Sequence, residues 1–148
     1  MKTVFEKTTR DELIYRISLL DENSKALWGK MNIYQMLKHC TVYEEMMLGK
    51  YIYKRAFLGR LFGKMALKEL MQDDTPIRSN VPTLPELKIK AQEGDVIAER
   101  KKWVALIEEY AKPSNSEIVH SFFGKLTTEQ VGYLVYKHMD HHLRQFNG

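Results

Sequence analysis

Apolar residues recur every three or four positions in four stretches of the chain, which is the spacing of an amphipathic helix. The first stretch follows Thr9–Glu12, which has the form of an N-terminal capping box, and it predicts a helix of roughly three turns. The second stretch runs from Trp28-Gly29 to about Gly49. No stretch alternates apolar and polar residues as a half-buried strand does, so we expect no sheet.

The third stretch runs from Gly94 or Asp95 to Tyr110, and Pro113–Ser116 is predicted to end it. The last stretch leads to Phe146 and follows Thr127 and Gln130, whose spacing is that of a second capping box. Four long helices joined with one long connection predict an all-α fold. We expect a four-helix bundle with a long crossover, formed by a single domain of residues 1–148.

Two connecting segments are unusual in composition. Residues 50–70 are basic and amphipathic, a pattern that suits binding to a membrane surface or to an anion. The favoured interpretation is a short irregular helix that covers the end of the bundle and has its lysines in water. Glycines at 49, 59 and 63 make one rigid helix a poor expectation there. Residues 72–85 hold three of the four prolines and predict an extended crossover, and Glu86–Ile89 predicts a brief strand or turn.

Three of the five histidines fall within five residues of the last helix. At about 100° per residue, His138, His142 and Gln145 continue its apolar stripe, whereas His141 lies roughly 80° from the centre of that stripe. The i, i+4 pair His138 and His142 can therefore reach one ion, and we expect His141 at the edge as a supporting group. Gln145 is a further candidate for the wall of such a site.

The second helix offers a matching face. Gln35, His39 and Tyr43 share its apolar stripe. Three histidines that face inward from two helices are costly as unpaired polar groups, but they meet the needs of a three-histidine metal centre with an open coordination position. The alternative is that they are hydrogen-bonded core residues. His39, His138 and His142 are the predicted ligands, with Gln35 as a further cavity candidate.

Several other polar residues of these two helices are expected to face away from the histidine stripe, and Glu44 and Glu45 are expected in water. Lys137, Asp140 and Arg144 lie opposite the histidine stripe, and Glu44 and Glu45 point away from His39, so no carboxylate is predicted as a general base. Cys40 at the edge of the stripe is predicted to be a small core residue.

Composition and charge limit which classes of protein this chain can belong to. The 148 residues are 44% hydrophobic, enough for the core of one domain, and the single cysteine excludes an intramolecular disulfide. The net charge of +4 and pI near 9.1 come from basic residues interleaved with acidic ones, without a nucleic-acid-binding motif. No signal peptide and no apolar run of the ~20 residues of a membrane span is recognised, so a cytoplasmic location is expected.

The two histidine segments carry a family resemblance. The motifs Trp28-Gly-Lys-Met-x-x-x-Gln35-Met-Leu-x-His39 and His138-x-x-His141-His142-x-x-Gln145 resemble those of the DinB/YfiT-like superfamily of candidate metal-dependent enzymes, and most closely a bacterial branch of unknown function. The resemblance implies a DinB-like four-helix bundle, commonly a homodimer, with zinc or nickel held by His39, His138 and His142. Many relatives continue His-His-Arg-Gly-Gln, whereas here Leu143 and Arg144 precede the glutamine, so no substrate role is carried over to an arginine.

Two functions are compatible with these features. An open position on a three-histidine ion lowers the pKa of bound water toward ~7, which suits a hydrolase, and the same position can bind a thiol cofactor, as in the S-transferases that the superfamily resembles. Either enzyme would act on a small-molecule substrate. The alternative is a non-catalytic metal-binding or ligand-binding bundle linked to stress.

Overall fold

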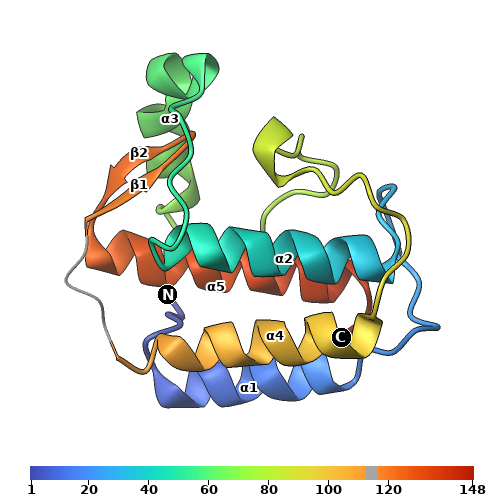
Figure 1. Cartoon of the computed structure of the whole chain (residues 1–148). Coiled ribbons are helices and arrows are strands. Elements are labelled where there is room, and N and C mark those ends of the chain that lie inside the picture. The colour runs from blue at the N-terminus through green and yellow to red at the C-terminus, as the bar shows by residue number, and fades with distance from the viewer. Residues whose placement is uncertain (113–116) are drawn as a thin grey trace.

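The computed structural model describes residues 1–112 and 117–148, so the prediction that Pro113–Ser116 ends a helix lies outside the described residues. The described chain is mostly helical, with five α-helices, one 3-10 turn and one hairpin (Figure 1). The elements are α1 (Lys7–Ser18), α2 (Ile33–Met47), α3 (Phe57–Leu70), η1 (Pro85–Leu87), α4 (Val96–Glu109), β1 (Ile118–His120), β2 (Gly124–Leu126) and α5 (Thr128–Gln145).

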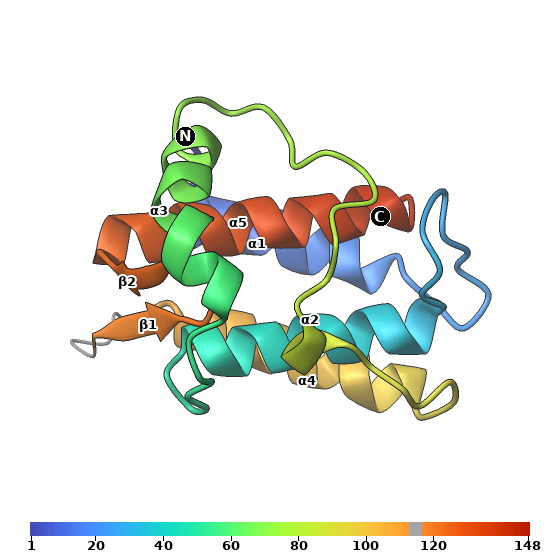
Figure 2. The ribbon, with the colours of Figure 1, turned by 90° about the horizontal axis from the view of Figure 1, so that it is seen from above.

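Four of the helices lie side by side around one core. Figure 1 shows α2 with α5 and α4 with α1, and Figure 2, seen from above, shows α2 with α4 and α5 with α1. Contacts join all four of these pairs. The side chains between them are wholly or almost wholly buried, among them Leu13, Ile17, Met36, Trp103 and Met139. The all-α class is thus confirmed at the level of a mostly helical chain.

Caps set the ends of three helices. Asp95 accepts a hydrogen bond from the backbone N–H of Ala98 at the start of α4, and the predicted capping box of Thr127 and Gln130 is present at the start of α5. At α2 the capping box is formed by Asn32 and Gln35, so the helix begins at Ile33, four residues after the Trp28-Gly29 pair that leads into it.

The capping box expected at Thr9 is wrong. The helix α1 begins at Lys7 after Glu6, which makes no side-chain cap, and Thr9 is buried in the first turn. The start is instead held by Arg10, whose buried guanidinium Nη1 donates to the carbonyls of Val4 and Phe5 at 3.0 and 2.8 Å. These bonds fold the preceding chain back over the helix end.

The α3 helix is continuous despite its glycines, contrary to the prediction. Gly59 and Gly63 are buried against the backbone of Phe122, and a Cβ at either position would lie 2.4 or 2.2 Å from the Phe122 carbonyl oxygen. The glycines therefore permit close contact between the helix and the turn of the hairpin. Figure 1 shows α3 and the hairpin together at one end of the molecule.

The expectation of no sheet is also wrong, because β1 and β2 form an antiparallel hairpin in which Ile118 pairs with Leu126 and His120 with Gly124. Each strand has three residues, too few for a period of two to be visible in the sequence. Residues 72–84 are extended, as predicted, and Pro85–Leu87 forms a 3-10 turn, so the turn rather than the strand is correct there. Among the described residues, the structure contains no helix long and apolar enough to cross a membrane.

Candidate metal centre

Three of the five histidines converge from α2 and α5. His39, His138 and His142 each offer a ring nitrogen, and these nitrogens all lie within 4.8 Å of one another. His39 and His142 are buried, whereas His138 keeps part of its surface accessible. The prediction that these residues are brought together is confirmed at the level of their positions, and among the described residues this is the cluster whose spacing suits a metal ion.

The proton of His39 is positioned by the chain before α4. Nδ1 of His39 lies 2.9 Å from the carbonyl oxygen of Leu87 in η1. A carbonyl only accepts, so Nδ1 carries the proton and Nε2 keeps its lone pair. Gln35 acts one step further away, since its side chain completes the cap of α2 and donates to the carbonyl of Ile89 at 3.2 Å. Gln35 therefore anchors the segment that supplies the Leu87 carbonyl.

His142 is oriented in a similar way by Gln145. Its Nδ1 lies 2.8 Å from Gln145 Oε1, while Gln145 Nε2 donates to the backbone carbonyl of Trp28 at 2.8 Å. The second bond fixes which end of the amide is the oxygen, so His142 Nδ1 carries the proton and Nε2 is the free nitrogen. The structure thus places the predicted residue Gln145 directly behind a predicted ligand.

His138 faces His39 across the gap between the two helices. Their Nε2 atoms are 3.0 Å apart, and Nδ1 of His138 makes no hydrogen bond within the described part of the chain. The ring of Tyr43, one helical turn after His39, stacks on the His138 ring with centroids 3.6 Å apart and an angle of 17°. Tyr43 therefore fixes the plane of His138 by packing where a hydrogen bond fixes the other two rings.

His141 lies at the edge of this cluster, as helical spacing predicted. Its Nδ1 is 3.2 Å from the carbonyl of Ile77 in the extended connection, and its ring meets the Trp28 ring edge to face at 5.8 Å. His141 also contacts the ring of His142 edge to face, with centroids 4.9 Å apart. It is a neighbour of the three ligands and does not belong to the cluster.

Burial keeps the three imidazoles neutral. It lowers the pKa of His39, and the hydrogen bond to Leu87 opposes that shift only in part. Burial lowers the pKa of His138 and His142 well below the usual range, and the neighbouring imidazoles lower it further. The neutral form with a free lone pair is the form that binds a metal.

The residues present fit a divalent ion. Tetrahedral coordination at a metal–nitrogen distance of about 2.0–2.1 Å places ligand nitrogens about 3.3 Å apart. The Nε2 atoms of His39 and His138 lie 3.0 Å apart, which is close to that value. All three ring nitrogens lie within 4.8 Å of one another, so small movements of the side chains would bring them to this spacing. Two of the three rings already have their outer nitrogen bound to an acceptor, as metal-binding histidines usually do.

The predicted solvent exposure of Glu44 is wrong. Glu44 is fully buried, and its Oε2 accepts from the Tyr110 hydroxyl at 2.7 Å. Burial raises the pKa of Glu44 to about 8, against the opposing effects of Tyr110 and Trp103. Because Glu44 follows His39 by five positions, it lies about 140° away around α2 and faces α4 rather than the histidines. Cys40 is a buried core residue, as predicted.

Two residues opposite the histidine stripe of α5 are buried as well. The Lys137 ammonium donates to the carbonyls of Leu70, Asp73 and Thr75 at 2.7, 2.6 and 3.1 Å. Asp140 accepts from Arg16 and from Arg144, both at 2.8 Å. The side of α5 opposite the histidines is therefore covered by the extended connection and by α1.

His120 has a different role from the other histidines. It is buried, and its Nδ1 accepts from the backbone N–H groups of Phe122 and Phe123 at 3.1 and 3.3 Å, which shapes the turn of the hairpin. Burial and the nearby Arg55 lower the pKa of His120 to about 4. An imidazole committed to the turn in this way is structural.

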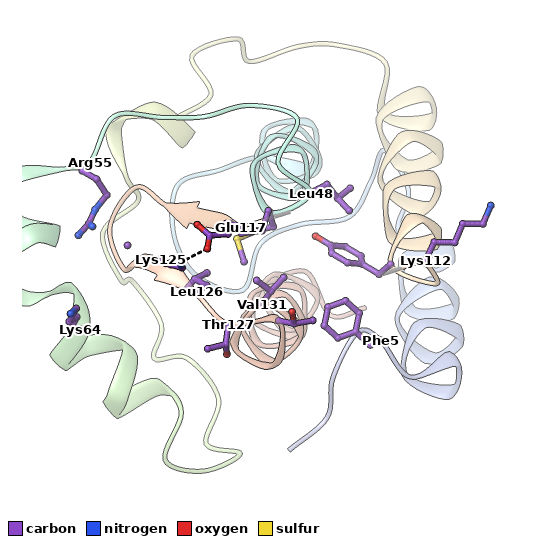
Figure 3. Close-up of a pocket in the computed structure, with 15 residues that line it drawn as sticks. Phe5, Leu48, Arg55, Lys64, Lys112, Glu117, Lys125, Leu126, Thr127 and Val131 are labelled. Atoms are coloured by element: carbon purple, nitrogen blue, oxygen red, sulfur yellow. Dashed lines mark hydrogen bonds and ion pairs between the residues drawn. The ribbon is translucent and has the colours of Figure 1, made fainter. Parts of the chain in front are cut away.

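One pocket of the structure lies away from the histidines. It has a volume of about 870 Å³ and is lined by the start of α5 and by residues of the hairpin, including Leu126, Thr127 and Val131 (Figure 3). Val131 precedes His138 by seven positions, which is about 10 Å along a helix. Among the basic residues that line the pocket, Lys125 forms an ion pair with Glu117, and Figure 3 shows Lys112 pointing away from the pocket. The pocket and the histidine cluster are thus separate features.

Comparison with known proteins gives a family and no closer relative. A family model described as "Protein of unknown function (DUF1569)" matches residues 3–148, which is nearly the whole chain. No curated protein and no solved structure matches the chain.

Proposed function

The chain belongs to the DUF1569 family of proteins of unknown function. From the geometry of its histidine cluster we propose that it is a metal-dependent enzyme. The ligands are His39, His138 and His142. The observation that supports this proposal is the fixed orientation of their rings, with His39 Nδ1 bound to Leu87 O and His142 Nδ1 bound to Gln145 Oε1. Both rings thereby keep Nε2 free for a cation.

The proposal includes the fold and setting implied by the resemblance. We propose that α1, α2, α4 and α5 form a DinB-like four-helix bundle and that the extended segment 72–84 belongs to its long crossover. The pairwise contacts of these four helices support this arrangement. The protein is further proposed to be a cytoplasmic homodimer that uses zinc or nickel.

The proposed reaction is hydrolysis of a small molecule or transfer to a thiol cofactor. A divalent ion with three imidazole ligands and an open position supplies Lewis acidity, which lowers the pKa of bound water or of a bound thiol. The chain supplies orientation: Leu87 and Gln145 hold two rings, and Tyr43 holds the third by stacking.

A non-catalytic metal-binding bundle is the alternative. The same geometry supports it, because no carboxylate within the described residues lies in the histidine cluster to act as a general base. The two functions differ in what occurs at the open position. Binding of metal or of a thiol is compatible with both, whereas turnover requires the enzyme.

Metal content of the purified protein tests the site. We expect one equivalent of divalent metal in the unaltered chain and loss of that metal in His39→Ala and His142→Ala. His120→Ala is the matched control, because it removes a buried imidazole that lies outside the cluster. Metal below one equivalent, with the same content in His39→Ala, would remove the metal-dependent proposal.

A second measurement separates the two reactions. Binding of small thiols to the metal-loaded protein is followed by cobalt absorption in the visible range and compared between the unaltered chain and His142→Ala. A saturable shift in the unaltered chain that disappears in the variant supports the S-transferase. Turnover of model esters or amides with no response to thiols supports the hydrolase.

A further inference from the structure

The outer face of α3 is apolar and exposed. Phe57, Leu58, Leu61 and Met65 are 74%, 60%, 61% and 67% exposed, and Phe62 is 49% exposed. These five residues, called the α3 stripe below, lie on the side of the helix opposite the buried residues Gly59, Gly63 and Leu67. Exposed apolar side chains gathered on one helix face in this way indicate a surface that binds a partner.

The α3 stripe is exposed because the contact between α3 and the hairpin fixes the rotation of the helix. The helix meets the hairpin through Gly59 and Gly63, where a Cβ would lie 2.4 and 2.2 Å from the Phe122 carbonyl oxygen. Rotation of α3 to bury the stripe would replace these glycines with leucine or phenylalanine side chains that the contact cannot accommodate. The stripe therefore faces outward as long as α3 contacts the hairpin.

Basic residues border the stripe on one side. Arg60, Lys64 and Lys68 are exposed and follow one another at intervals of four, so they form a row along one edge of α3. Among the described residues, the ion pairs involve none of these three. The sequence from Lys50 to Lys68 contains no aspartate or glutamate, and the one carboxylate of α3 is Glu69, next to Lys68, so the helix carries more basic than acidic groups.

We propose that the α3 stripe and its basic edge bind the surface of an anionic lipid bilayer. Phenylalanine, leucine and methionine would enter the boundary of headgroups and acyl chains, while Arg60, Lys64 and Lys68 contact lipid phosphates. A second copy of this chain is less suited, because an antiparallel twofold contact through the stripe would set the two basic rows against each other. An anionic bilayer supplies the opposite charge along the whole row.

Vesicle co-sedimentation of the full chain tests the proposal. We expect the protein to bind vesicles of equal parts phosphatidylcholine and phosphatidylglycerol, to bind phosphatidylcholine alone weakly, and to be released as salt is raised. The variant Leu58→Ser/Leu61→Ser/Met65→Ser, and separately Arg60→Gln/Lys64→Gln/Lys68→Gln, should each weaken binding about tenfold or more. Both sets of side chains are exposed, so the melting temperature should be retained.

Matched controls alter equally exposed residues elsewhere. Tyr15→Ser/Leu19→Ser/Leu27→Ser removes exposed apolar groups from α1 and the connection after it, and Lys25→Gln/Lys90→Gln/Lys101→Gln removes three exposed charges. Neither control should change vesicle binding by more than about twofold. Equal loss in the controls, equal binding to neutral and anionic vesicles, or no binding overturns the proposal. Self-association that the stripe variant abolishes, without vesicle binding, assigns the surface to a second copy instead.

Discussion

The Nε2 atoms of His39 and His138 lie 3.0 Å apart, although 99 positions separate the two residues in sequence. His39 Nδ1 donates its proton to Leu87 O, so the lone pair of His39 Nε2 points at His138. Two lone pairs cannot face each other at this distance without a positive group between them. Either a proton on His138 or a cation shared by both rings must occupy the contact.

This relationship predicts that a divalent ion stabilises the folded chain. Metal at one hundred times its dissociation constant should raise the free energy of unfolding by about 2.7 kcal/mol, which for a chain of this length raises the melting temperature by roughly 5–10 °C. Thermal unfolding with zinc, with nickel and after chelation measures the effect. His138→Ala should abolish it, whereas an equal rise in that variant would show that the metal binds elsewhere.

Substitution of Gln145 should change the metal affinity, although Gln145 would not contact the metal. Gln145→Ala leaves His142 Nδ1 without its acceptor, so the ring loses its fixed orientation, and metal affinity should fall about 10–100-fold. Competition with a chromophoric chelator measures this affinity. The control is Gln130→Ala, which removes a hydrogen-bonded glutamine from the first turn of the same helix and should cost stability but leave metal affinity unchanged. Equal affinities in both variants would contradict the positioning role of Gln145.

The convergence of the three histidines was predictable from sequence because helical periodicity specifies which side chains share a face. His39, His138 and His142 each continue an apolar stripe, and α2 lies against α5 along those stripes. The groups behind the ligands were only partly predictable. Gln145 lies on the same face as His142, but the carbonyls of Leu87 and Trp28 come from irregular connections, and no side-chain pattern reports where a backbone carbonyl will lie.

The errors about exposure share one physical cause. The predictions assigned one buried face to each helix, whereas α2 contacts both α4 and α5, so Glu44 is buried on a second face. On α5, the extended connection and α1 cover Lys137 and Asp140. The hairpin and the continuous α3 depend on each other through two glycine contacts with Phe122, which are long-range and leave no local periodicity.

Glu44 predicts that stability depends on pH. Its pKa in the folded state is about 8, compared with 4.5 for an unburied glutamate, so folding favours the protonated form. The unfolded chain loses that proton first, so the contribution of Glu44 to stability should fall as pH rises from about 4.5 to 8. The buried histidines, whose pKa values are lowered, act in the opposite direction in the acidic part of this range, so the effect of Glu44 is seen in the difference from a variant that cannot ionise there. The loss has an upper limit of about 5 kcal/mol.

The test is Glu44→Gln, which cannot ionise and keeps an acceptor for the Tyr110 hydroxyl. Denaturant unfolding across this pH range should show the variant gaining relative to the unaltered chain by about 1.4 kcal/mol per pH unit at most. Below about pH 4.5 the difference should be constant. A difference that does not change with pH would show that the carboxyl is ionised in the folded protein.

The buried ammonium group of Lys137 is predicted to hold the extended connection in place. It donates to the carbonyls of Leu70, Asp73 and Thr75, which lie at the end of α3 and in the chain that follows. Lys137→Met keeps most of the side-chain volume but leaves the three carbonyls without this donor, and it should cost about 2–3 kcal/mol of stability. Hydrogen exchange should speed up over residues 71–77. Lys125→Met, which removes an exposed ion pair with Glu117, is the control and should change stability by less than about 1 kcal/mol. If exchange over 71–77 is unchanged in Lys137→Met, the connection is held by other contacts, and the carbonyl of Ile77 behind His141 does not depend on this lysine.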